Sequence, residues 1–313
     1  MDTASSLRID RRSGLLLLTL AALWGSTFLF AEIALTELSP MQVTLHRVVI
    51  AAVALWLVLR LRGVKLPRAP RLWGAYLVMG ALNNALPFTL IFWGQTHIES
   101  GLAAILNAST GVLGAVVAGL LLRDERLSWR KVAGAGLGLA GVAVVIGPDR
   151  LTTLDPRNLG QGAVLLAALS YSLASVWGKL RLAGQPPLAN AFGMLAGAAV
   201  IMLPLVLWQD GLPTLDYAPR VWAALLGLSL LATALAFILY FAILSRAGAA
   251  NLMLVTLLIP PFAIVIGRVV LGEQLPPGVY LGLGIIAAGL VVTDGRLVGR
   301  LRRKPPADEA QVP

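Results

Sequence analysis

The chain has 313 residues, of which 58% are hydrophobic and only 13% are charged. Soluble domains carry about 25% charged residues, so this composition excludes a soluble globular class and indicates an integral membrane protein. The absence of cysteine excludes disulfides and cysteine-ligated metal sites. The net charge of +10 lies mostly in short loops between apolar segments, which points to membrane topology and gives no reason to expect nucleic acid as a partner.

Apolar segments of about 20 residues, the length that crosses a bilayer, follow one another along the whole chain. Their continuous apolar character disfavours a β-barrel, whose strands alternate. The first segment follows a basic N-terminus like a signal peptide, but its apolar run is too long, so we expect a retained helix. We therefore expect an all-α integral membrane protein with ten transmembrane helices, at 13–36, 41–60, 71–94, 100–122, 131–147, 160–180, 188–208, 219–244, 249–271 and 277–295.

Lysine and arginine separate to one side of this arrangement. Twenty of the 25 lie on the side of the two termini, whereas only Arg150, Arg157 and Arg220 lie on the other side. Because basic residues mark cytoplasmic loops, both termini are expected in the cytoplasm. Residues 1–12 then form a cytoplasmic N-terminal segment, and 296–313 a disordered basic cytoplasmic tail near anionic lipid.

An internal repeat divides the chain. Residues 115–141 match residues 263–289 without a gap, with nine identities in the 27 positions. Each copy holds five predicted spans, and an odd number places the second copy upside down relative to the first. The sequence therefore predicts two inverted five-helix repeats, 13–147 and 160–295, the architecture of many secondary transporters.

The repeated Glu-x-Leu motif followed by a glycine-rich span resembles the EamA family of the drug/metabolite transporter superfamily. The motif places Glu125 before Gly134, Gly136 and Gly141, and Glu273 before Gly282, Gly284 and Gly289. The opening Ala22-Leu23-Trp24-Gly25-Ser26-Thr27-Phe28 and Arg47 are also similar to that family. The resemblance covers residues 13 to 295. It implies ten helices, alternating access and export of small metabolites from the bacterial inner membrane, with YddG-type amino-acid exporters as functional analogues.

Several polar and aromatic side chains fall near the middle of the predicted spans. A buried hydroxyl, amide or indole N–H needs a partner there, because hydrocarbon offers none. Such groups either bond neighbouring helices, at about 0.6 kcal/mol on average, or line a wet central cavity. Because helices from both repeats contribute them, we predict a substrate-binding set, namely Trp24, Asn83, Asn84, Phe88, Asn107, Thr110, Tyr171, Tyr240 and Thr256.

Prolines interrupt two of the predicted helices. Pro87 falls in the third helix and Pro260-Pro261 fall near the centre of the ninth. Each proline frees a carbonyl in the preceding turn, which could bind a substrate ammonium group or could simply mark a packing kink. In either case we expect hinge points for the switch between inward-open and outward-open states.

Charged residues within the predicted spans are scarce, so Glu32 and Arg47 are candidate gating residues. Three roles remain open for Glu32: an ion pair with Arg47, proton transport, or a solvated position at the interface. The repeated Glu125 and Glu273 are expected to stabilise helix N-termini, by about 0.3–1 kcal/mol each. Gly134 with Gly138, and Gly278 with Gly282, predict close packing of the fifth and tenth helices, within the chain or in a dimer.

The function expected from these features is secondary transport, with export of small metabolites and above all amino acids, by facilitation or exchange. The alternative is multidrug or cationic-metabolite efflux by proton antiport through Glu32. An enzyme is not expected, since the spans hold no nucleophile–base pair and no acid cluster. No cofactor or metal is expected, and no Walker motif is present. The expected partners are a small-molecule substrate and the lipid bilayer, with the chain a monomer or weak homodimer.

Overall fold

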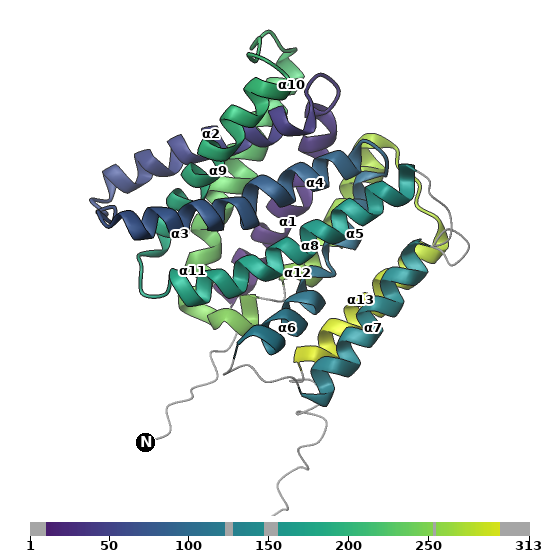
Figure 1. The fold of residues 1–313 in the computed structure, drawn as a ribbon. Helices are drawn as coiled ribbons and strands as arrows, with labels where there is room; N and C mark the ends of the chain where they lie inside the picture. Colours follow the sequence, from purple (N-terminus) through teal and green to yellow (C-terminus); the bar gives the residue numbers. More distant parts are fainter. Residues whose placement is uncertain (1–10, 123–127, 147–155, 253–254, 295–313) are drawn as a thin grey trace, which may run out of the picture.

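The computed structural model describes residues 11–122, 128–146, 156–252 and 255–294, and every regular element in those ranges is a helix (Figure 1). Eight of these helical stretches are long and apolar enough to cross a membrane, and two shorter apolar ones follow at Val255–Leu271 and Pro277–Thr293. The chain is therefore an all-helical, multi-pass membrane protein.

The first half contains α1 (Arg11–Ala34), α2 (Pro40–Leu61), α3 (Pro70–Gly80), η1 (Ala81–Ala85), α4 (Leu86–Gln95), α5 (Ser100–Asn107), α6 (Thr110–Leu121) and α7 (Trp129–Ile146). The second half contains α8 (Pro156–Arg181), α9 (Pro187–Gln209), α10 (Pro219–Leu226), η3 (Gly227–Leu235), α11 (Ala236–Leu252), α12 (Val255–Ile266), η4 (Gly267–Leu271) and α13 (Pro277–Asp294). The η elements are π-helices, in which the backbone bonds reach back five residues instead of four.

Three predicted spans differ from the structure. The fourth, expected as one helix over 100–122, is interrupted at Ala108 and Ser109 between α5 and α6. The third is a helix widened by η1 rather than one broken at Pro87. The loop expected at 245–248 is part of α11, whose alanine-rich end favours continued helix.

Helices α7 and α13 pack together along their length at one margin of the molecule (Figure 1). Their contact is between glycines: a Cβ at Gly141 would lie 2.9 Å from the carbonyl oxygen of Gly282, and one at Gly282 would lie 2.8 Å from that of Gly141. Gly134 and Gly289 face each other in the same way. The predicted close packing of these helices is thus found within the chain, although Gly278 has no neighbour within 4 Å and takes no part.

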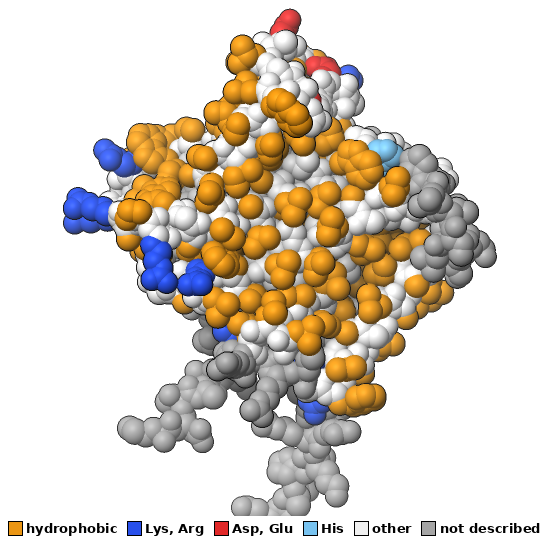
Figure 2. All heavy atoms as spheres, viewed as in Figure 1, with side chains coloured by type: hydrophobic (Ala, Val, Ile, Leu, Met, Phe, Trp, Pro, Cys, Tyr) orange, Lys and Arg blue, Asp and Glu red, His pale blue; other side chains and the backbone are white. Residues whose placement is uncertain are grey.

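The outer surface is largely apolar, as contact with a lipid bilayer requires. Hydrophobic side chains cover most of the visible face, with most Lys and Arg along its left and lower margins and Asp and Glu at its upper end (Figure 2). Large apolar side chains are exposed on the molecule, including Val200 (66%), Leu166 (50%) and Leu203 (49%). Such exposure would be unfavourable in water but costs nothing against lipid tails.

Candidate functional site

The interruption between α5 and α6 lies within an apolar span. Two hydroxyls stabilise it, because Ser109 Oγ donates to the carbonyl of Leu106 at 2.7 Å and Thr110 Oγ1 donates to that of Asn107 at 2.6 Å. Such local side-chain bonds compete with the helical ladder and favour a turn. The side-chain oxygen of Asn107 is buried and has no hydrogen-bond partner in the described part of the chain. Discontinuous helices of this kind form substrate sites in many transporters.

Two π-helices occur at matching places in the two halves. The third and eighth spans begin at Pro70 and Pro219, which are 149 residues apart. The same shift moves η1 (81–85) to 230–234, which lies inside η3 (227–235). Because π-helical segments are frequent at functional sites, we treat η1 and η3 as equivalent candidate parts of the site.

The η1 segment lies just before Pro87, which has no N–H to donate. The N–H of Leu86 bonds the carbonyl of Ala81, five residues back. In this register the next carbonyl, that of Leu82, would receive its bond from residue 87, and proline cannot supply it. Ser170 Oγ of α8 donates to that carbonyl at 2.6 Å. The oxygen freed by Pro87 is therefore bonded within the protein, which supports the packing interpretation of this proline.

Both asparagines of η1 lie in the interior. Asn83 donates to the Asn84 side-chain oxygen at 3.3 Å and contacts the sulfur of Met194 at 3.7 Å. Asn84 is fully buried, and its Nδ2 has no hydrogen-bond partner among the described residues. One turn further, Phe88 is 4% exposed and packs in the central apolar core.

Arg47 is buried beside η3. Its Nε donates to Thr233 Oγ1 at 2.8 Å, and its guanidinium lies 3.6 Å from the centre of the Phe88 ring. Thr233 in turn donates to the carbonyl of Leu228 at 2.7 Å. Arg47 thus joins the second, third and eighth spans, and Tyr171 of α8 lies within electrostatic reach of it.

The suggested ion pair between Arg47 and Glu32 is wrong. Within the described ranges the structure has no such pair, and Glu32 instead accepts a hydrogen bond from Gln95 Nε2 at 3.3 Å. The same nitrogen donates to the carbonyl of Phe28 at 2.9 Å, which ties α4 to α1. Arg47 instead contacts Phe88 and Thr233.

The central aromatic residues belong to different clusters. Trp24 and Tyr240 have ring centroids 5.9 Å apart and pack with an apolar cluster of α1, α11 and α12. Tyr171 packs instead against the main core. Among the described residues no ring contact joins Trp24 to Tyr171, so these two predicted binding residues do not stack on each other.

The paired prolines of the ninth span do not break it. Pro260 is buried and Pro261 is exposed, and both lie inside the continuous α12. The carbonyls four residues back, those of Thr256 and Leu257, lose their usual helical donors. Thr256 is half-buried there.

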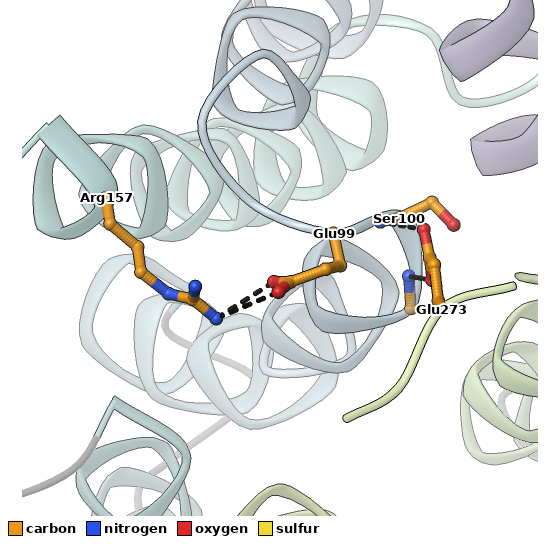
Figure 3. A network of polar contacts seen from close by, with 5 residues as sticks. Glu99, Ser100, Arg157 and Glu273 are labelled. Atoms are coloured by element: carbon orange, nitrogen blue, oxygen red, sulfur yellow. Dashed lines mark hydrogen bonds and ion pairs between the residues drawn. The ribbon is translucent and has the colours of Figure 1, made fainter. Parts of the chain in front are cut away.

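The carboxylate of Glu273 caps a helix, but not the one that follows it. It accepts hydrogen bonds from the backbone N–H groups of Ser100 at 2.7 Å and Gly101 at 3.0 Å, at the start of α5 (Figure 3). The neighbouring Glu99 pairs with Arg157 of α8 at 2.9 Å. The predicted structural role of Glu273 is confirmed for a different helix, and Glu125 lies outside the described residues.

Two surface hollows lie away from the predicted binding residues. One, of about 420 Å³, is lined almost entirely by apolar side chains of α6, α7 and α8, with Ser109 as its polar member. The other, of about 560 Å³, lies between α3 and α8 and ends at Arg71 and Arg181. Neither contains any member of the predicted substrate-binding set.

Sequence reasoning did not select Gln95 or Ser170 for the site. Both are 3% exposed and bond across helices. Their common signal is a polar residue in an apolar span, and for Ser170 the cue is a proline that leaves a carbonyl without its donor. The sequence could not reveal that Pro87 and Ser170 meet.

Comparison with known proteins matches both halves of the chain. Residues 12–147 and 158–293 each match the EamA-like transporter family. A probable terminal-alkyne amino-acid exporter of Streptantibioticus cattleyicolor is 29% identical, over 89% of this chain and 92% of its own length. The uncharacterized transporter YoaV of Bacillus subtilis is 24% identical, over 88% and 94%. The uncharacterized inner membrane transporter YedA of Escherichia coli K12 is 25% identical, over 88% of each chain.

A solved crystal structure has the same fold, with a TM-score of 0.66 at 20% identity, and covers 92% of this chain and 99% of its own. The two family matches together span most of the chain, as the internal repeat predicts. The chain therefore belongs to the EamA-like transporter family, and its fold carries that family's domain twice.

Proposed function

We propose that this protein exports small metabolites, and amino acids in particular, across the inner membrane of a bacterial cell by alternating access. The carrying observation is the set of buried polar atoms at helix irregularities, above all Asn84 Nδ2 in η1 and Asn107 Oδ1 at the end of α5, which have no partner within the described residues. One group can donate and the other can accept, which suits a neutral or zwitterionic solute. The relative named as a probable amino-acid exporter points to the same class.

The proposed arrangement has ten spans, both termini in the cytoplasm and two inverted repeats, with the two shorter helices Val255–Leu271 and Pro277–Thr293 completing the second repeat. Substrate would bind near Trp24, Asn83, Asn84, Phe88, Asn107, Thr110, Tyr171, Tyr240 and Thr256. The segments around Pro87, Pro260 and Pro261 would bend as the two ends open alternately.

The test is flux of a panel of labelled amino acids in proteoliposomes, with and without a pH gradient. We expect flux without a gradient. Trp24→Ala should lose most of this flux, because it removes the indole ring that packs against Tyr240. Trp208→Ala is the control, because Trp208 is 84% exposed near the end of α9. Absence of flux for every amino acid would contradict the substrate class.

Proton-driven efflux of cations is a second candidate, favoured by the surroundings of Glu32. Its carboxylate lies within electrostatic reach of Glu99 and Glu273, so three acids gather at one end of the helices. If Glu32 carries the proton, Glu32→Gln removes pH-driven transport while leaving gradient-free exchange. Equal pH dependence in the variant and the wild type would exclude that role.

A further inference from the structure

Arg47 is a buried cation whose hydrogen-bonding capacity is almost unused. The residue is 6% exposed and lies about two turns into the apolar helix α2. A guanidinium has five N–H donors, and in this structure only Nε has an acceptor, Thr233 Oγ1 at 2.8 Å. The two terminal nitrogens form no hydrogen bond or ion pair with any described residue.

The two terminal nitrogens of Arg47 also keep accessible surface. The buried polar atoms that lack a partner include Asn84 Nδ2, Asn107 Oδ1 and Ser229 Oγ, but no atom of Arg47. The two unpartnered nitrogens of Arg47 therefore each keep some accessible surface. A buried guanidinium with accessible, unused donors is what a ligand-binding residue presents.

The guanidinium of Arg47 is held by aromatic rings and by a hydroxyl group. The Phe88 ring lies 3.6 Å from its central carbon and that of Phe92 lies at 5.8 Å, which are stacking and cation–π distances. Thr233 fixes Nε, and its own hydroxyl proton is directed to the carbonyl of Leu228. The fork is thus positioned before any ligand arrives, which lowers the entropic cost of binding.

Further unpartnered polar groups lie one turn away from both residues that hold Arg47. Asn84 precedes Phe88 by four residues and Ser229 precedes Thr233 by four, so each pair follows one side of its helix. Asn84 Nδ2 and Ser229 Oγ are both buried and have no partner in the described ranges. Both groups can donate to an anion.

We propose that Arg47 binds the carboxylate of the transported solute, through two parallel hydrogen bonds from its terminal nitrogens. A planar guanidinium matches a carboxylate in this geometry, whereas arginines with structural roles in membranes pair with protein carboxylates or carbonyls. The inference rests on the proposed function and deepens it, because it restricts substrates to small carboxylates and excludes amines and amides of the same shape. Arg47 is then a substrate-binding residue rather than half of a gate.

The first test compares an amino acid that the wild type transports with its carboxamide, as competitors for labelled flux. We expect the carboxamide to compete at least 10-fold more weakly, because it offers one acceptor and no charge. Arg47→Gln should lower flux at least 10-fold, and Arg47→Lys should retain part of it, because a point charge replaces the fork. Arg220→Gln, at an arginine that is 70% exposed, makes the same chemical change away from the site and should have no effect.

The second test needs no transport. Purified wild-type protein in detergent is heated with sodium propionate, with sodium chloride, or with propionamide plus sodium chloride. All three samples have the same ionic strength. We expect propionate alone to raise the melting temperature, and Arg47→Gln to remove that rise. A shift of the wild type with propionate but no amino-acid flux would reject the proposed function and keep the carboxylate site.

The inference is overturned if chloride or propionamide stabilises the wild type as well as propionate does, or if none of them does. It is also overturned if the carboxamide competes as strongly as the acid. Both comparisons use the wild type, so they decide the matter even if Arg47→Gln fails to fold.

Discussion

The two halves of the molecule keep their packing alike and differ in their polar groups. Helices α7 and α13 meet through glycines from both copies, with Gly141 against Gly282 and Gly134 against Gly289. By contrast, Arg47 and Met194 occupy the same position in α2 and α9, which begin at Pro40 and Pro187. One contacts Thr233 in η3 and the other contacts Asn83 in η1.

Burial is the same at these two positions, at 6% for Arg47 and 5% for Met194. The fold therefore needs a long side chain at this place, but it does not need the charge. Duplication supplied a symmetric framework, and the groups available to a solute then diverged between the copies. A framework residue should consequently affect folding, whereas a diverged residue should affect transport.

The largest expected effect is on the shared framework. Gly282→Leu places side-chain atoms where the Gly141 carbonyl already lies, and backbone cannot move aside as a side chain can. We expect a loss of about 3 kcal/mol, the upper part of the range for overpacking, or failure to fold. Gly284→Leu is the control, because nothing lies within 4 Å of a Cβ there. Melting temperature in detergent and monodispersity are the readouts, and equal losses in both variants would refute the packing account.

The next effect concerns the carbonyl that Pro87 leaves without a donor. Ser170→Ala should cost about 1–3 kcal/mol, because the Leu82 oxygen would be buried without a partner. Pro87→Ala restores an N–H, so the double variant should lose less than Ser170→Ala alone. Ser175→Ala is the matched control, since its exposed hydroxyl donates to the carbonyl of Tyr171 in the same helix. Additive losses in the double variant would show that Pro87 and Ser170 are not coupled.

A smaller effect is expected at the two acids beside α5. Glu273→Gln should cost about 1 kcal/mol, because a charged cap on two N–H groups becomes neutral. Glu99→Gln should cost about 0.2–1 kcal/mol, since its pair with Arg157 is roughly one-third exposed. The stability losses of the two variants are compared by thermal unfolding in detergent. A larger loss for Glu99→Gln than for Glu273→Gln would contradict the predicted order.

Sequence reasoning reached the helical membrane class and the doubled family because both depend on composition and on residues that recur in register. It also placed Glu273 in a capping role. It could not identify α5 as the capped helix, because Ser100 and Glu273 are 173 residues apart and meet only in the folded chain.

The irregular helices were predicted less well, for a physical reason. Proline marks a missing donor, but whether the helix breaks, widens or continues depends on its neighbours. Pro87 follows a π-helix in which Ser170 bonds the Leu82 carbonyl, whereas Pro260 and Pro261 lie inside the α-helix α12. The break at Ala108 and Ser109 has no proline, and its signal was the Ser109-Thr110 pair that bonds its own backbone.

The smallest effect on transport is expected from Met194, the counterpart of Arg47. Met194→Leu keeps volume and apolar character, so it should cost less than about 1.5 kcal/mol and leave the transport rate unchanged. Arg47→Met makes the first half like the second, and should remove transport while leaving the melting temperature within a few degrees. Normal transport by Arg47→Met, or loss of transport in Met194→Leu, would show that the two positions have not diverged in function. The charge at one position and the thioether at the other would then serve the same packing role.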